Sequence, residues 1–275
     1  MISNVSRDKN IEQTQVYRTT TEEILKNEKD ILDTLNEGDP DAAFKRLTLV
    51  ELMLNLTSNY IVIDGVIRAV LKLRSEESLN EARKALYKSI IYLEEIVSKY
   101  IDAPYSDYED KLAAIETVSP ADRYLLVRKM GLTIDLLKSA YGENTKWKWT
   151  FVEIEGRYAT VAKNIMNLKT VLINSNFDSE HYEPTVRHLA LIKELLMQAA
   201  NRFREKYELS SNRIDDFKMG ILFLSALRRL CIVTGDQAEA VTTKKKLDTW
   251  NQKLAADMEK MEKEEKEDKL DSKKG

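Results

Sequence analysis

The chain has 275 residues, with 43 basic and 46 acidic side chains and a formal net charge of −3. Hydrophobic residues make up 43% and charged residues 32%, a balance typical of a globular protein that forms one large domain or two small ones. The low counts of 8 Gly, 4 Pro, 2 His and 1 Cys exclude disulfide scaffolds, Cys/His zinc sites and Gly-rich disordered chains.

The apolar residues recur at intervals of three and four, and no segment alternates apolar and polar residues as a strand does. This spacing predicts an all-α fold. The helices are expected at 20–36, 40–57, 59–74, 78–101, 107–117, 120–141, 146–173, 183–207, 212–233 and 236–267. The second and third of these can also be one continuous rod, because no residue between them breaks a helix firmly.

The predicted architecture is an elongated array of antiparallel helix pairs, or irregular helical bundle. Residues 1–19 are expected to be a flexible N-terminal segment and residues 20–256 an all-helical domain, for which two lobes that meet near 102–119 are one arrangement. Residues 257–275 alternate Lys and Glu and are expected to form a charged tail, either helical or disordered.

The acidic balance argues against a nucleic-acid partner, which requires an excess of Lys and Arg on one face. No stretch of 18 residues is free of charge, so no membrane insertion is expected. Residues 1–21 are polar and lack the apolar core of a signal peptide. This start predicts a cytoplasmic protein, unless the sequence begins at a processed or recombinant end.

We find no motif that would identify a reaction. Gly-rich phosphate loops are missing, and Asp178-x-x-His181 is only half of the paired pattern that a di-iron bundle requires. His188 is interpreted as an ordinary packed or half-exposed histidine and Cys231 as a small buried hydrophobe. The sequence therefore predicts a non-enzymatic protein with no catalytic residue, metal ligand or cofactor. An enzyme or ligand-binding bundle that uses His181 or His188 is a minor alternative.

One segment concentrates aromatic and basic residues at a predicted helix start. Trp147 and Phe151 are four residues apart and share a helix face, whereas Trp149 points about 200° round the helix. Aromatic side chains flanked by Lys are typical anchors for another protein, although the same residues could pack a helix corner. The candidate protein-binding residues are Lys146, Trp147, Lys148, Trp149, Phe151 and Tyr158.

A second candidate is a basic strip suited to an acidic partner, for which the alternative is Arg and Lys side chains on the outer faces of neighbouring helices. Its residues are Arg187, Lys193, Arg202, Arg204, Lys206, Arg228 and Arg229.

The segment 142–158 reads GENTKWKWTFVEIEGRY and is similar to the spirochaetal flagellar coiling proteins, which are periplasmic, all-helical components of the sheath around the flagellar filament. The resemblance implies a structural protein that binds the core filament or other sheath proteins laterally, with a homo-oligomer as a further form of assembly, and contributes to filament curvature and motility. It also implies a periplasmic location, which requires the given sequence to be the mature part of the protein.

The alternative function is a cytoplasmic adaptor of tetratricopeptide type that binds a protein partner in a concave groove. Residues 38–44 resemble the start of a tetratricopeptide helix, and residues 79–100 resemble another. The 34-residue period does not extend over the rest of the chain, so a regular solenoid is not predicted.

Overall fold

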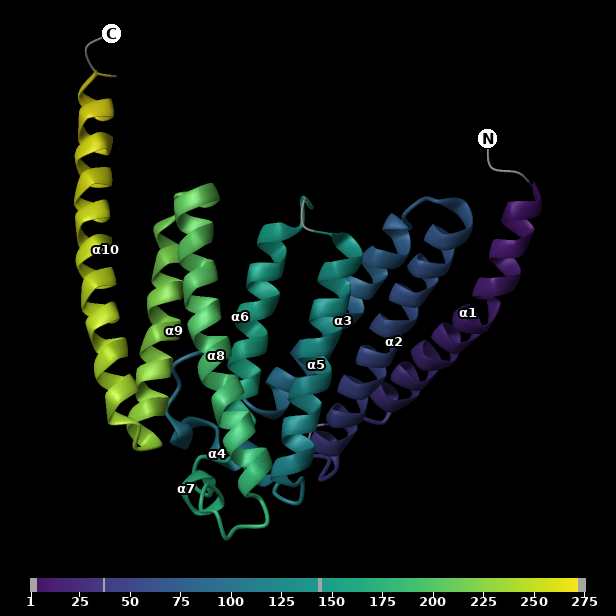
Figure 1. Cartoon of the computed structure of the whole chain (residues 1–275), viewed down its shortest axis with the longest axis horizontal. Helices are drawn as coiled ribbons and strands as arrows, with labels where there is room; N and C mark the ends of the chain where they lie inside the picture. Colours follow the sequence, from purple (N-terminus) through teal and green to yellow (C-terminus); the bar gives the residue numbers. More distant parts are fainter. Residues whose placement is uncertain (1–3, 37, 143–144, 272–275) are drawn as a thin grey trace. The chain divides into compact units, whose positions relative to one another are not determined.

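A computed structural model describes residues 4–36, 38–142 and 145–271 of the chain (Figure 1). These residues form ten α-helices and no strand, which confirms the predicted all-α fold. The chain divides into two compact units. Unit 1 comprises residues 1–99 and 104–188, and unit 2 comprises residues 100–103 and 189–275.

In unit 1, helix α2 packs between α1 and α3, α5 packs against α2 and α3, and α6 packs against α3 and α5. Neighbouring helices joined by short connections, such as α2 and α3, therefore form antiparallel pairs (Figure 1). The helices are α1 (Asn4–Asp33), α2 (Ala42–Leu71), α3 (Glu76–Ile96), α4 (Glu109–Ala113), α5 (Pro120–Tyr141), α6 (Lys148–Asn164), α7 (Val171–Asn174) and the first residues of α8 (Tyr182–Lys206).

Helix α1 begins at Asn4, so residues 4–19 of the expected N-terminal segment are helical. No Gly or Pro occurs before Gly38 to interrupt a helix. Thr14 is fully buried, and the carboxylate of Glu28, 4% exposed, accepts hydrogen bonds from Lys88 (2.9 Å) and Tyr92 (2.7 Å) on α3. Polar contacts thus help to hold α1 against α3. The periodic spacing of apolar residues does not reveal such contacts in the sequence.

Helix α2 runs without a break from Ala42 to Leu71 and is the single rod that the sequence allowed. Its length and composition would also let it cross a membrane. Leu49 and Met53 are fully buried, and Met53 packs in a cluster with Ile24 of α1 and Ala85 of α3, as in the core of a helical bundle.

Gly131 on α5 lets α6 approach closely. A Cβ atom at this position would lie 2.5 Å from the hydroxyl oxygen of Tyr158 on α6. That hydroxyl donates a hydrogen bond of 2.9 Å to the carbonyl of Val127. The missing side chain of Gly131 therefore makes room for a buried hydrogen bond between two helices.

Unit 2 contains the rest of α8, a π-helical turn (Tyr207–Ser211), α9 (Ile214–Val233) and α10 (Gln237–Asp271). Its core is aromatic: Phe203 stacks on Phe223 with ring centroids 5.6 Å apart, and Phe217 lies between Tyr207 and Trp250 at 5.1 and 5.6 Å. These rings join α8, α9 and α10 into one small bundle.

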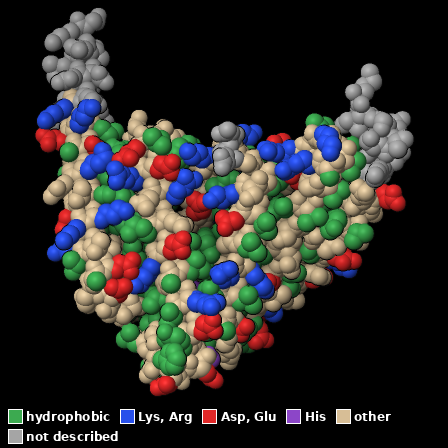
Figure 2. Space-filling model, in the orientation of Figure 1, with side chains coloured by type: hydrophobic (Ala, Val, Ile, Leu, Met, Phe, Trp, Pro, Cys, Tyr) green, Lys and Arg blue, Asp and Glu red, His purple; other side chains and the backbone are tan. Residues whose placement is uncertain are grey.

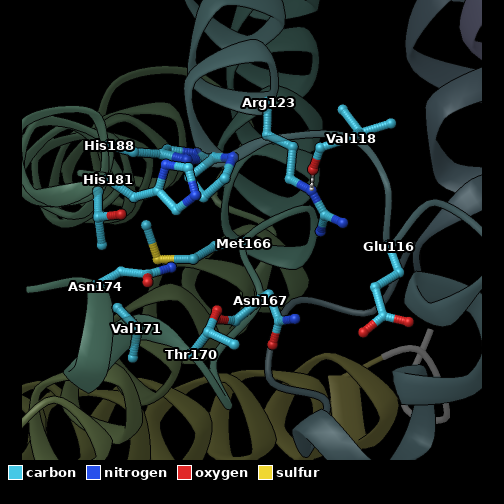
Figure 3. Close-up of a pocket in the computed structure, with 12 residues that line it drawn as sticks. Glu116, Val118, Arg123, Met166, Asn167, Thr170, Val171, Asn174, His181 and His188 are labelled. Carbon is cyan, nitrogen blue, oxygen red and sulfur yellow. Dashed lines mark hydrogen bonds between the residues drawn. The ribbon is translucent and has the colours of Figure 1, made fainter. Parts of the chain in front are cut away.

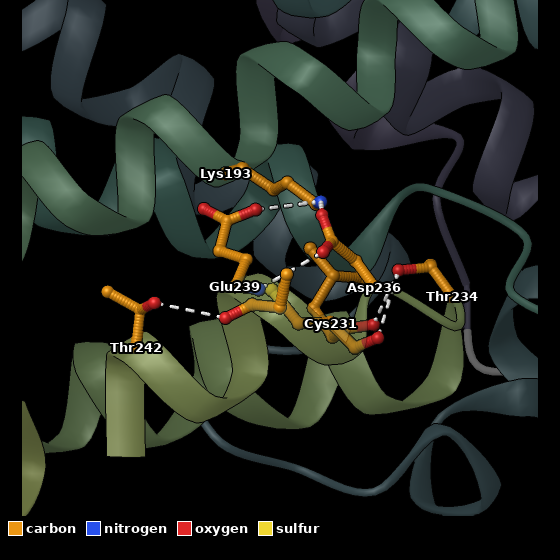
Figure 4. A network of polar contacts seen from close by, with 8 residues as sticks. Lys193, Cys231, Thr234, Asp236, Glu239 and Thr242 are labelled. Atoms are coloured by element: carbon orange, nitrogen blue, oxygen red, sulfur yellow. Dashed lines mark hydrogen bonds and ion pairs between the residues drawn. The ribbon is translucent and has the colours of Figure 1, made fainter. Parts of the chain in front are cut away.

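The turn between α9 and α10 is fixed by polar contacts (Figure 4). Gly235 adopts the left-handed conformation (φ 79°) that favours Gly just after the end of a helix. Asp236 accepts a hydrogen bond from the backbone N–H of Glu239, and the ammonium of Lys193 on α8 binds both carboxylates at 2.5 and 2.8 Å. Cys231 is fully buried beside this network, as predicted, and burial raises the pKa of its thiol to about 12.

Helix α10 continues to Asp271, so the charged tail is helical from residue 257 to that point, and residues 272–275 lie outside the described residues. Asp257 breaks the heptad of apolar residues in the sequence. It accepts a hydrogen bond of 2.8 Å from the Tyr207 hydroxyl and pairs with Lys253 at 3.1 Å. A polar contact thus replaces an apolar one at the end of the unit 2 core.

We expect Gly131→Ala to lower the free energy of unfolding by about 1–3 kcal/mol, because the new methyl group displaces the Tyr158 hydroxyl from its acceptor. Gly65→Ala is the matched control: nothing lies within 4 Å of its added Cβ on α2, so better helix propensity should raise the same free energy by about 0.5–1 kcal/mol. Urea unfolding followed by circular dichroism measures both. Equal shifts in the two variants would contradict the close approach of α5 and α6.

Candidate functional site

The predicted aromatic segment is split by the structure between core and surface. Phe151 and Tyr158 are 3% and 5% exposed, so these two candidate residues lie in the core and offer a partner almost no surface. Their face of α6 is the apolar stripe that packs into unit 1. Trp147 and Trp149 are half-buried, Lys146 is exposed, and Lys148 is half-buried with its ammonium 4.8 Å from the ring centroid of Trp149.

Trp147 lies at the start of α6 against the end of α5 and the middle of α3. The guanidinium of Arg83 stacks over its ring at 4.4 Å, and Tyr141 contacts it edge-on with centroids 6.4 Å apart. Tyr141 also packs edge-on against Phe151 at 5.6 Å. Trp147 is therefore a corner residue within unit 1, which is the packing alternative that the sequence allowed.

The basic strip consists largely of ion pairs. Lys206 contacts Asp216 at 3.0 Å, Arg204 contacts Glu208 at 2.8 Å, and Arg187 contacts Glu183 at 2.7 Å. Lys193, Arg202 and Arg229 pair with acidic residues in the same way. Because carboxylates neutralise most of these cations, the strip has little charge left for an acidic partner.

A pocket of about 250 Å³ lies in unit 1 and brings together the two histidines of the chain (Figure 3). Residues from the loop before α5, from α5, from the segment around α7 and from the first turns of α8 form its walls. The lining residues are Glu116, Val118, Pro120, Arg123, Met166, Asn167, Thr170, Val171, Asn174, His181, Thr185 and His188.

Arg123 is the buried cation of this pocket, with 4% of its surface exposed. Its guanidinium donates to the carbonyls of Ile115 (2.7 Å), Val118 (3.0 Å) and Ile165 (2.9 Å). Among the described residues, no carboxylate lies within ion-pair distance of it. Burial lowers its pKa, yet an Arg side chain keeps its proton in a protein, so a positive charge remains in the wall.

His188 lies on α8 with 2% of its surface exposed. Its Nε2 is 3.0 Å from the carbonyl oxygen of Ala162, which can only accept, so we assign the proton to Nε2 and leave Nδ1 as an acceptor. Burial is the main cause that lowers the pKa of His188 from 6.5 to about 4, and the charge of Arg123 acts in the same direction. The imidazole is therefore neutral at pH 7.

Thr185 is one turn before His188 on α8 and is 4% exposed. Its hydroxyl is buried and has no hydrogen-bond partner among the described residues. An unsatisfied buried hydroxyl is unfavourable and uncommon in a native protein. His181, 36% exposed at its side chain, is 3.4 Å from the carboxylate of Glu180. Both histidines thus line one pocket, but only His188 belongs to its buried part.

Helix α7 presents a second feature on its opposite side. Thr170, Val171 and Asn174 line the pocket, whereas large apolar side chains of the same segment are exposed to solvent. We call the exposed set the α7 apolar surface, and it consists of Leu172 (60% exposed), Ile173 (70%) and Phe177 (81%). Figure 2 shows hydrophobic side chains gathered where Figure 1 places α7. Grouped exposed apolar residues typically mark an interaction site.

Sequence reasoning identified His181 and His188 but not the residues that surround them. Arg123 and Thr185 have no motif, and Arg123 is 65 residues away from His188 along the chain. The one signal in the sequence that could have identified Arg123 is its place on the first turn of a helix that begins with Ser-Pro. An Arg at this place can reach the carbonyls at the end of the preceding segment. Among the described residues, no group of three His, Cys, Asp or Glu side chains is arranged to hold a metal ion.

We expect the buried neutral His188 to make stability depend on pH. The unfolded chain binds a proton at this residue near pH 6.5 and the folded chain near pH 4, so the free energy of unfolding falls as the pH drops from 6.5 towards 4. The loss should be on the order of 3 kcal/mol. His188→Gln cannot titrate and should lack this part of the decrease. Urea unfolding of both proteins between pH 7 and 4 measures the difference, and parallel curves would contradict a neutral buried imidazole.

The chain was compared with known proteins and protein families. No curated protein and no solved structure matches it. A family match covers residues 6–258, which is most of the sequence. The chain belongs to the TP0443 family, which is named after a protein of the spirochaete Treponema pallidum.

Proposed function

We propose that this protein is a non-enzymatic structural component of the sheath around a spirochaetal periplasmic flagellum. In this role it binds the core filament or other sheath proteins laterally and contributes to filament curvature and motility. The family link to a spirochaete and the likeness of residues 142–158 to flagellar coiling proteins support this proposal. The α7 apolar surface is the observation that carries it.

Lateral assembly requires a surface whose burial contributes favourable binding free energy. An interface between proteins has an apolar core of a few large side chains, which contributes most of the binding free energy, and a polar rim. Phe177 and Ile173 fit such a core, because they are 81% and 70% exposed and Asp178 is the only charged residue from 170 to 179. A low local charge favours an apolar protein surface over a charged polymer as the partner.

A contact between two different surfaces of repeated subunits does not close on itself and builds an open array. A sheath is an array of this kind. Such a coat on only one side of a filament makes the subunit spacing along the covered side differ from that along the uncovered side. This difference in spacing bends the filament. This geometry connects lateral binding with curvature.

We expect the native protein to copurify with periplasmic flagella. Cells of the source spirochaete are fractionated, and the flagellar, periplasmic and cytosolic fractions are blotted for this chain. Enrichment on filaments supports the sheath proposal. A soluble cytosolic pool would contradict it and would favour the helical adaptor instead.

The double variant Ile173→Asp with Phe177→Asp should weaken cosedimentation with isolated filaments by about tenfold or more, because it places charges in the apolar core of the contact. Val16→Asp on α1 is the matched control, since Val16 is also 70% exposed but lies outside the α7 apolar surface. Both proteins should keep the helix content of the wild type. Equal loss of binding in the two proteins would show that this surface has no special role.

Trp149→Ala tests the part of the predicted aromatic anchor that remains half-buried at the surface. If Trp149 contacts the filament, this variant weakens cosedimentation with unchanged circular dichroism. Unchanged cosedimentation would restrict the contact to the α7 apolar surface and remove the aromatic segment from the proposal.

A further inference from the structure

The pocket of unit 1 has the features of a ligand site rather than of a packing defect. A packing defect is small and apolar, and its lining leaves no polar group unsatisfied. This pocket combines a buried cation, a neutral imidazole and a buried hydroxyl that has no partner among the described residues. Figure 3 shows the cation, Arg123, and the imidazole, His188. We propose that it binds a small organic monocarboxylate with a compact apolar body. This inference is independent of the proposed sheath function.

Arg123 supplies the charge that such a ligand would meet. Three of the five N–H bonds of its guanidinium are directed at the carbonyls of Ile115, Val118 and Ile165. Two N–H bonds remain, one on each terminal nitrogen. The three carbonyls fix the plane of the guanidinium before any ligand arrives, so little side-chain entropy is lost on binding. A carboxylate is the planar anion that fits this group best.

Thr185 provides the second observation and does not depend on the first. Its hydroxyl is buried and has no partner in the described part of the chain, and it can donate to a ligand oxygen. His188, three residues later on the same helix face, offers an Nδ1 acceptor because Nε2 is held by Ala162. The Thr185 hydroxyl therefore gains a partner when a carboxylate oxygen enters, whereas the Nδ1 acceptor of His188 does not, because a carboxylate has no hydrogen to donate.

The remaining walls determine the body of the ligand. Met166, Val171, Val118 and Pro120 are apolar and line the same space. The pocket volume of about 250 Å³ exceeds the ~150 Å³ cavity that is known to hold benzene in another protein. A short alkyl chain or a single ring fits, whereas a nucleotide or a long acyl chain is too large.

The charge balance favours one negative charge over two. Among the residues that the structure describes, Arg123 is the only Lys or Arg that lines the pocket, and the carboxylate of Glu116 lines it as well. A monoanion neutralises the guanidinium, and a dianion such as a phosphate monoester would add a charge that Glu116 repels. A phosphorylated ligand is therefore the less favoured anion.

Titration calorimetry of the full chain with butyrate and benzoate tests this proposal at pH 7. We expect saturable binding of at least one of these two monocarboxylates. Benzamide, which has the shape of benzoate without its charge, and phenyl phosphate, which carries a second charge, should each bind more weakly by at least about tenfold. The absence of saturable binding by both carboxylates would overturn the proposal. Equal or tighter binding of benzamide or of phenyl phosphate would overturn it too.

Thr185→Val places the site on the molecule. The substitution removes the unpaired hydroxyl at nearly constant volume and should weaken carboxylate binding by about three- to tenfold without loss of thermal stability. Thr243→Val is the matched control, because Thr243 on α10 is 1% exposed and its hydroxyl is also buried without a partner, but it lies in unit 2. Arg123 is unsuitable as a test, since it also holds three carbonyls. An equal effect of both variants, or none of either, would assign the binding to another place.

Discussion

The corner of unit 1 that holds the pocket depends on one buried guanidinium. The guanidinium of Arg123 stays protonated even when it is buried. The fold must therefore surround a permanent positive charge with partial negative charges. It does so with the carbonyls of Ile115 and Val118, which follow α4, and with that of Ile165, which ends α6. Carbonyls at the C-terminal end of a helix carry the negative end of its dipole, so the end of α6 and the turns after α4 converge on one cation.

This convergence explains why α6 ends where it does. The sequence predicts one helix over 146–173, because its apolar residues keep helical spacing and no Pro interrupts it. In the structure α6 ends at Asn164, and the side chain of Asn164 donates a hydrogen bond of 2.7 Å to the carbonyl of Ser98. Arg123 binds the carbonyl of Ile165, and the Ser98 carbonyl, which follows α3, binds the side chain of Asn164. These two contacts let the chain turn away from the helix axis after Asn164. Both partners are remote in sequence, so local pattern cannot detect them.

The helices themselves follow closely from spacing and capping. Ser119 accepts a hydrogen bond of 3.1 Å from the N–H of Asp122, and Pro120 begins α5 as predicted. The errors arise where polar contacts replace apolar ones. Thr14 and Glu28 are buried polar residues of α1, and the spacing of apolar residues cannot predict their burial. Phe151 and Tyr158, which the sequence offered as candidate partner contacts, lie in the core, since an apolar stripe at a spacing of three and four faces the core more often than a partner.

The candidate site shows the same division between what is local and what is not. His181 and His188 were recognisable as the only histidines, but the sequence could not indicate that they share a pocket with Arg123 and Thr185. Their grouping requires α5, the segment after α6 and the start of α8 to meet in three dimensions. The spacing of residues along the chain predicts which of them share a helix face. It does not predict which three distant segments pack together, because that depends on the tertiary structure.

Helix α7 joins the two proposals physically. Thr170, Val171 and Asn174 face the pocket, while Leu172 and Ile173 belong to the α7 apolar surface on the other side. A ligand that orders this four-residue helix reduces the entropy that a protein partner must remove on docking, and the partner does the same for the ligand. Coupling of this kind is reciprocal by thermodynamic necessity. The two proposals rest on separate observations, and α7 is the element through which a ligand in the pocket and a protein on the α7 apolar surface would affect each other.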